Sequence, residues 1–178
     1  LWDKKGLILM VSLVTTLIAG IYAFTAKEQW TVKAYVSPPR IAQFEDYLTL
    51  RRAFARVSGI SADPQVIANQ LFSRFTDMVS SPNEKLTYLS ETAYVKQQTE
   101  SMEPHAKRLW LTEMADQGLV TSPPDEKQTL PYFMLSVSAD NPQVALALLT
   151  DYVERINDQV IAQDDAEFQN NLQAMILA

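Results

Sequence analysis

An uncharged stretch of 18 residues, Leu7 to Phe24, limits most strongly what this chain can fold into. As a helix rising about 1.5 Å per residue it would be about 27 Å long, close to the roughly 30 Å hydrocarbon core of a bilayer. Its aliphatic hydroxyls, on Ser12, Thr15 and Thr16, can each bond to a carbonyl of their own helix. We therefore predict a transmembrane helix over residues 7–26.

Two other interpretations of this stretch fit less well. A buried helix of a soluble protein would normally carry a polar face, and this stretch has none. A cleaved signal peptide has an apolar stretch of about 7–15 residues followed by small residues at the cleavage site. Cleavage after Ala26 would instead place the bulky Phe24 at the third position back. A retained membrane anchor is the better interpretation.

The charges that flank the stretch predict its orientation. Lys4 and Lys5 precede it, whereas Lys27 follows alone and is next to Glu28. The positive-inside rule then makes residues 1–6 a cytoplasmic flank and places the chain from Glu28 onward outside the cytoplasm.

The composition of the remaining chain excludes several classes of protein. One of the 21 acidic and three of the 15 basic residues lie in residues 1–27, so the rest carries a net charge of −8. That balance argues against nucleic acid or anionic lipid as the main partner. The chain has no cysteine and no glycine-rich phosphate-binding motif. We predict no metal and no cofactor.

Two stretches with alternating apolar side chains predict a small sheet. Residues 30–36 alternate with a period of two and end at Ser37-Pro38-Pro39, where proline cannot donate to a ladder. Residues 130–139 predict a second strand, with Phe133, Leu135 and Val137 on one face.

Helices are predicted between and after these strands. The first covers residues 41–57, and the second begins at the cap Asp63 and carries an apolar stripe. Residues 81–84 read as a capping box, shorter helices follow over residues 86–95 and 104–117, and residues 121–127 are expected to form an exposed loop. The stripe of the second helix is formed by Ile67, Leu71, Phe75 and Met78.

The C-terminal part of the chain predicts one very long helix. Asn141 can cap it and Pro142 suits its first turn, and no Pro or Gly follows up to Ala178. We therefore expect it to be truncated in mid-course and either to project from the body or to pack against another chain. Its apolar stripe is formed by Leu149, Val153, Ile156 and Val160. The expected fold class is mixed α/β (α+β), with an α/β domain over residues 28–142 and an extended helix over residues 143–178.

No candidate catalytic group emerges from the sequence. The single histidine, His105, is expected at the surface, and no GxSxG motif supports a nucleophile. Adjacent helical residues point about 100° apart, so Asp164 and Asp165 cannot act as an acid/base pair. With Glu167 they are expected on the wet side of the helix or on a rim that faces another subunit. The cations Arg51, Arg52 and Arg56 are expected on a solvated face, paired with neighbouring acids, in preference to a sugar-phosphate or lipid headgroup.

The chain as a whole resembles the Wzz-type polysaccharide co-polymerases, the bacterial O-antigen chain-length determinants. The resemblance rests on residues 27–31, which lead into the strand that ends at Pro38-Pro39. It rests also on residues 133–139, followed by Pro142, Ala145, Leu148, Leu149 and Tyr152. Members carry a second transmembrane helix after a proline-rich stretch, and this chain has neither, which is the second reason to expect truncation.

The resemblance implies a non-enzymatic protein of the bacterial inner membrane with a periplasmic α/β base domain. Members assemble into rings or bells and act with the O-antigen polymerase on a lipid-linked polysaccharide to set its length. Two other hypotheses remain open. A periplasmic sensor domain of a receptor or kinase would need a return span and a cytoplasmic signalling module. A membrane-tethered hydrolase would need two converging carboxylates or a nucleophile.

Overall fold

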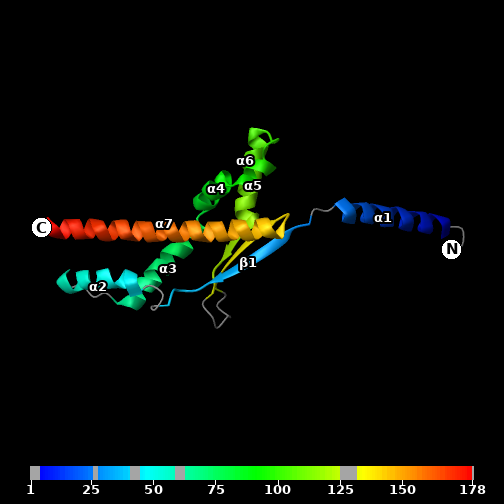
Figure 1. Cartoon of the computed structure of the whole chain (residues 1–178). Coiled ribbons are helices and arrows are strands. Elements are labelled where there is room, and N and C mark those ends of the chain that lie inside the picture. The colour runs from blue at the N-terminus through cyan, green and yellow to red at the C-terminus, as the bar shows by residue number, and fades with distance from the viewer. Residues whose placement is uncertain (1–4, 26–27, 41–44, 59–62, 125–131, 178) are drawn as a thin grey trace.

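The long helix α7 (Pro142–Ile176) sets the length of the molecule, and the other elements lie beside it or beyond its N-terminal end (Figure 1). The computed structural model describes residues 5–25, 28–40, 45–58, 63–124 and 132–177. Helix α1 (Lys5–Thr25) extends beyond the start of α7. The N-terminal helix and the C-terminal end of α7 therefore lie at opposite ends of the molecule.

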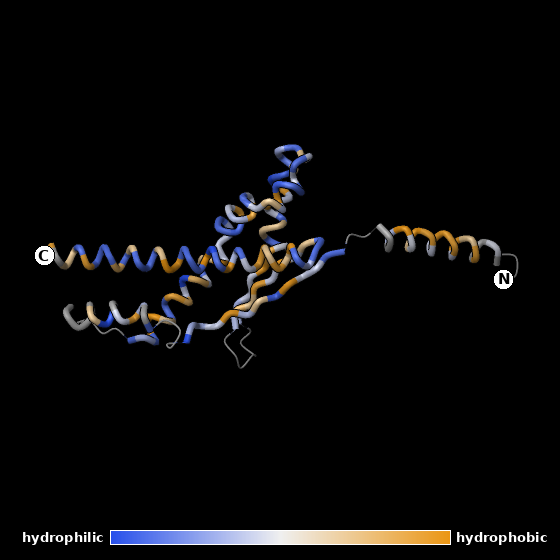
Figure 2. Tube along the Cα trace, in the orientation of Figure 1, coloured by the Kyte–Doolittle hydropathy of each residue, from blue (hydrophilic) through white to orange (hydrophobic). Residues whose placement is uncertain are grey.

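Helix α1 forms where the sequence predicts a helix. Thr16 donates to the carbonyl of Ser12 at 2.8 Å, and Thr15 donates to the carbonyl of Val11, so these hydroxyls are satisfied within the helix. Figure 2 shows apolar residues along most of its length. Ala26, at the end of the predicted span, lies outside the described residues. Across the described ranges, no helix combines the length and the hydropathy needed to cross a membrane.

The sheet contains both predicted strands as an antiparallel pair. Strand β1 (Trp30–Val36) pairs with β3 (Phe133–Ala139), in a register that runs from Trp30 opposite Ala139 to Val36 opposite Phe133. Residues 130 and 131, the predicted start of the second strand, lie outside the described residues. Alternate residues of β1 are half-buried beyond Trp30, so the period-two pattern does mark the face that packs inward.

A third strand corrects the predicted loop. Strand β2 (Leu119–Ser122) pairs with β3 on the side away from β1, giving the order β1-β3-β2. Thr121 and Ser122 are therefore strand residues, whereas Pro123 and Pro124 are exposed and residues 125–127 lie outside the described residues. The four residues Leu-Val-Thr-Ser do not alternate between apolar and polar, which is why the sequence did not reveal this strand.

In the described part of the chain, five helices follow one another between β1 and β2. Their bounds are α2 (Glu45–Ser58), α3 (Pro64–Ser80), α4 (Pro82–Glu91), α5 (Ala93–Gln98) and α6 (Pro104–Glu113), and the short π-helix η2 (Met114–Gly118) leads into β2. Asp63 caps α3 by accepting from the Gln65 amide at 2.9 Å, and Asn141 caps α7 by accepting from the Gln143 amide at 2.8 Å. Both caps were predicted.

Two local predictions fail at helix ends. Ser81 precedes α4 but makes no side-chain capping bond, so the predicted capping box does not form. The single helix predicted over residues 86–95 is broken at Thr92, whose extended backbone ends α4 and whose hydroxyl accepts from the Val95 amide at 3.4 Å to start α5. A threonine hydroxyl competes with the helical backbone in this way.

The core lies where the first half of α7 crosses the sheet and helices α3 to α6. Leu149, Ile156 and Val160 of the predicted stripe are buried there against Leu135 and Val137 of β3, among others. Two buried phenols link the surrounding helices to α7. Tyr152 donates to the Val79 carbonyl of α3 at 2.9 Å, and Tyr88 of α4 donates to the Leu148 carbonyl at 2.7 Å. Their rings lie 4.9 Å apart.

Candidate functional site

A group of charged side chains joins α2, α3 and α7 just beyond the core. Asp164 of α7 is at its centre: Arg51 Nη2 of α2 lies 2.5 Å from its Oδ2, and Arg74 Nη1 of α3 lies 3.4 Å from its Oδ1. Arg74 also pairs with Glu167 at 2.6 Å, and the Tyr47 hydroxyl donates to Asp164. We call these five residues the α7 charge cluster.

Arg51 is held by rings as well as by charge. Its guanidinium carbon lies 4.4 Å from the centre of the Tyr47 ring and 4.6 Å from the centre of the Phe168 ring. It also reaches Asp165 at 3.3 Å. A guanidinium stacked on aromatic faces gains cation–π attraction in addition to its ion pairs. Arg51 thereby covers the ring of Phe168 on α7.

Burial makes this cluster electrostatically tight. The side chains of Arg51 and Asp164 are only 14% and 15% exposed, so their attraction is screened less than at an open surface. Burial, and then the hydrogen bond to Asp164, raise the pKa of Tyr47 well above its ordinary value. The hydrogen bond to Glu167 likewise raises the pKa of Arg74. Tyr47 and Arg74 therefore stay protonated as donors, and the cluster joins α2, α3 and α7.

The cluster revises the predictions made for its residues. Asp164 does not lie on a wet face, because its side chain is only 15% exposed and binds α2 and α3 of its own chain. Arg51 does pair with acids, but it is not on a solvated face. Arg52 pairs with Glu45 at 2.5 Å, as a surface cation would. The side chain of Arg56 lies outside the described residues.

Other site predictions have simpler outcomes. His105 is exposed in the first turn of α6, where a surface residue was expected. Among the described residues, no group of three His, Cys, Asp or Glu side chains could hold a metal ion. Sequence reasoning missed Arg74. The sequence does mark Arg74 as the sole cation of helix α3. Its partners on α7, however, can be identified only from the fold.

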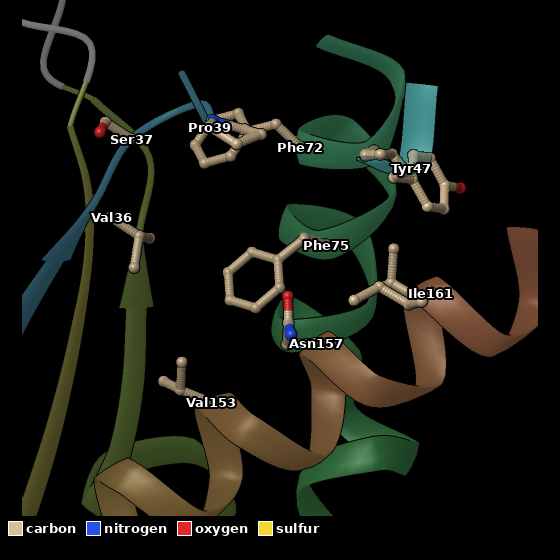
Figure 3. Close-up of a pocket in the computed structure, with 11 residues that line it drawn as sticks. Val36, Ser37, Pro39, Tyr47, Phe72, Phe75, Val153, Asn157 and Ile161 are labelled. Carbon is tan, nitrogen blue, oxygen red and sulfur yellow. The ribbon is translucent and has the colours of Figure 1, made fainter. Parts of the chain in front are cut away.

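An apolar groove of about 490 Å³ adjoins the cluster (Figure 3). Phe72 and Phe75 of α3 and Val153 and Ile161 of α7 line it, and Figure 3 shows Val36 on the side of the sheet. Among the described residues of its lining, the polar groups are Ser37, Asn157 and the Tyr47 hydroxyl, and the other side chains are apolar. Such a surface can bury apolar side chains, but it offers no nucleophile with an adjacent base.

The same fold occurs in a solved polysaccharide co-polymerase. The whole arrangement, with an N-terminal helix, a three-stranded antiparallel sheet among helices and one very long helix, is similar to that of a full-length bacterial polysaccharide co-polymerase. The TM-score is 0.68 at 20% sequence identity, and the match covers 97% of this chain and 47% of that one. The fold therefore belongs to the class of the co-polymerases.

The sequence comparisons identify the family. The chain length determinant protein family, Wzz, matches residues 1–92, which is more than half of the chain. A chain length determinant protein of Escherichia coli is 26% identical over 174 residues, and the ferric enterobactin transport protein FepE of Escherichia coli (strain K12) is 22% identical over 180 residues. Each match covers 97% of this chain, but the chain spans only 45% and 47% of these two relatives. The chain belongs to the Wzz chain length determinant family.

Proposed function

We propose that this chain is part of an inner-membrane regulator that sets the length of the O-antigen polysaccharide of lipopolysaccharide. In this proposal it works as a homo-oligomer, in a ring or bell, together with the O-antigen polymerase and its lipid-linked polysaccharide. The observation that carries the proposal is the family match over residues 1–92, which includes α1, β1 and the helices that form the charge cluster with α7.

A membrane anchor at α1 is the first part of the proposal. Large apolar side chains are exposed around this helix: Leu9 is 69% exposed, Met10 70% and Leu13 58%. Apolar side chains exposed on every side of a helix favour lipid as the surroundings. We propose that residues 7–26 span the inner membrane with residues 28–178 in the periplasm.

Labelling can test this topology, because the chain has no cysteine of its own. Single cysteines at Gly6, Glu28 and Glu113 would be exposed to an impermeant maleimide in intact spheroplasts. We expect labelling at Glu28→Cys and Glu113→Cys but not at Gly6→Cys until the cells are opened. Labelling of Gly6→Cys in sealed cells would contradict the orientation.

Assembly through α7 is the second part of the proposal. Leu146, Ile161 and Met175 are 56%, 40% and 38% exposed. At about 100° per residue their side chains fall within about 60° of one another around the helix axis. This stripe begins at the core and runs past the groove, so a neighbouring copy could bury it along most of α7.

Charge substitutions on this stripe test the assembly. We expect Ile161→Lys and Met175→Lys to reduce the oligomer measured by mass photometry of the full-length protein in lipid nanodiscs. Gln169→Lys, exposed on a different face of α7, is the matched control and should leave assembly intact. A wild-type protein that is monomeric in both detergent and lipid would exclude the proposal.

A regulatory role without catalysis is the third part. It is supported by the charge cluster, in which the Asp164 carboxylate is bound by Tyr47, Arg51 and Arg74 and so is not a free acid or base. Deletion of the gene should change the distribution of O-antigen lengths on a gel while polymer is still made, and the full-length gene should restore it. An unchanged length distribution would overturn the proposed function.

A further inference from the structure

A second cleft, of about 330 Å³, lies at the opposite end of β1 from the apolar groove, close to the junction with α1. It is formed where the end of β3 meets α5, α6 and η2. Glu28 and Gln29, which lead from α1 into β1, complete it. Figure 1 shows that the chain leaves this end of β1 toward α1, so an anchored α1 would place the cleft next to the membrane.

The lining of this cleft differs from that of the groove. It combines two aromatic rings with amides and carboxylates, and its residues include Tyr94, Gln98, Trp110, Glu113, Gln117 and Asp140. Aromatic faces pack against apolar ring faces, and amide and carboxylate groups pair with hydroxyls. Sugar rings present both kinds of surface, with C–H groups on their faces and hydroxyls around their edges.

One carboxylate of the cleft is already oriented. The Tyr94 hydroxyl donates to Asp140 Oδ1 at 2.7 Å, and the Gln98 amide donates to Asp140 Oδ2 at 3.0 Å. Burial and the bond to Asp140 raise the pKa of Tyr94 to about 12, so its hydroxyl remains a donor at neutral pH. These two bonds fix the orientation of the Asp140 carboxylate. Its remaining lone pairs therefore point in defined directions, as a binding site requires.

Charge and size narrow the class of ligand. Glu28, Glu113 and Asp140 line the cleft, and no Lys, Arg or His is among its described lining residues. A phosphate or an acidic sugar would be repelled there. The volume is near the lower end of the range for small-molecule sites, about 300–1,000 Å³, so it suits one or two sugar rings.

We propose that this cleft binds a neutral sugar unit of the polysaccharide close to the membrane. Trp110 and Tyr94 supply ring faces, Asp140 and Glu113 accept from hydroxyls, and Gln117 donates and accepts. This inference rests on the proposed function, because it is the regulated polysaccharide that brings sugar to this end of the fold. The cleft would hold the glycan near its lipid-linked end.

Binding to the full-length protein in lipid nanodiscs tests the cleft directly. The probe is a neutral O-polysaccharide freed from lipopolysaccharide by mild acid, observed by saturation-transfer NMR and titration calorimetry, with polygalacturonate as the acidic comparison. We expect Asp140→Asn and Gln117→Ala each to weaken binding by about five- to tenfold, because each removes hydrogen bonds to hydroxyls. Glu103→Gln, an exposed glutamate at the start of α6 outside the cleft, is the control and should bind as wild type does.

Trp110 gives a second, independent variant. Because Trp110 also packs against the core, the polysaccharide binding of Trp110→Leu is compared with that of wild type only after circular dichroism shows a native helix content. Gln117 is exposed, so its variant keeps the test valid even if Trp110→Leu does not fold. Absence of transfer to the neutral polysaccharide, equal binding of polygalacturonate, or unchanged binding in Asp140→Asn and Gln117→Ala would overturn the inference. A changed O-antigen length on gene deletion would in those cases leave the proposed function standing.

Discussion

The phenol of Tyr47 donates a hydrogen bond to the carboxylate of Asp164, across a separation of 117 residues in the sequence. This bond ties α2 to a part of α7 that lies beyond the core. Polar contacts to Tyr47 and Arg51, together with stacking on Phe168, fix α2 where few buried aliphatic side chains are described. The position of α2 on the long helix therefore depends on the charge cluster.

The two adjacent aspartates should contribute very differently to stability. Asp164→Asn removes the charge that Arg51 and Arg74 share, and we expect a loss of about 2 kcal/mol in the free energy of unfolding. Asp165→Asn is the matched control, because Asp165 is 51% exposed and pairs with Arg51 alone among the described contacts, so its loss should stay below about 1 kcal/mol. Urea titration of the purified protein measures both. Equal losses would show that the additional partners of Asp164 contribute nothing to the free energy of unfolding.

The buried phenols should each lose one hydrogen bond on conversion to phenylalanine. Tyr88→Phe and Tyr152→Phe keep the ring packing but remove donors to the Leu148 and Val79 carbonyls, and we expect about 1 kcal/mol of destabilisation for each. Tyr35→Phe, at a side chain that is 62% exposed on β1, should change stability by less than about 0.5 kcal/mol. Thermal unfolding of the three variants under one set of conditions provides the comparison, and a Tyr35→Phe effect as large as the others would refute this account.

A side chain at Gly118 should be destabilising, because the buried Met114 would have to move to make room for it. A Cβ there would lie 2.3 Å from Met114 Sδ, a buried side chain that would have to move, so we expect Gly118→Ala to cost about 1–3 kcal/mol. Gly20→Ala is the control, because a Cβ at Gly20 meets nothing within 4 Å and alanine favours a helix. Shortening the obstructing side chain, as in Met114→Val, should make the added cost of Gly118→Ala smaller. If the losses of stability from Gly118→Ala and Met114→Val simply add in the double variant, Met114 is not the cause of the Gly118→Ala effect.

The ion pair between Glu91 and Arg155 should give a pH-dependent contribution. The hydrogen bond from Arg155, 2.5 Å long, lowers the pKa of Glu91 below its ordinary value. A carboxyl whose pKa is lower in the folded state stabilises the fold above its unfolded pKa and loses that effect as the pH falls through its folded pKa. The small difference in Tm between wild type and Glu91→Gln should therefore be present at pH 7 and shrink below about pH 4.5. Arg155→Met should reproduce this behaviour, and a gap that widens in acid would contradict it.

Much of the fold could be predicted because its signals are local. The alternation in residues 30–36 marks a strand, and Asp63 and Asn141 start helices through bonds to residues two positions ahead. Strand β2 escaped prediction because only its pairing with β3 identifies four residues as a strand. Ser81 shows the opposite error, since a capping motif was present in the sequence but the bond did not form.

The charge cluster could not be predicted for a related reason. Arg51, Arg74 and Asp164 come from three different helices, and no spacing in the sequence relates them. Asp164 and Asp165 share Arg51, whose Nη2 lies 2.5 Å from the first carboxylate and 3.3 Å from the second, and Asp164 also pairs with Arg74. Both carboxylates reach Arg51 because α2 lies against α7, and this packing follows only from the tertiary structure.

The strand order has a consequence for biosynthesis. Because β3 is central, the hydrogen bonds of β1 are made to residues 133–139, which leave the ribosome about a hundred residues later. Strand β1 cannot pair with β3 until all the helices from α2 to α6 have been synthesised, and pairing between such distant segments is slow. A nascent chain stalled before Phe133 would thus expose β1, without its hydrogen-bonding partner, to chaperones and proteases.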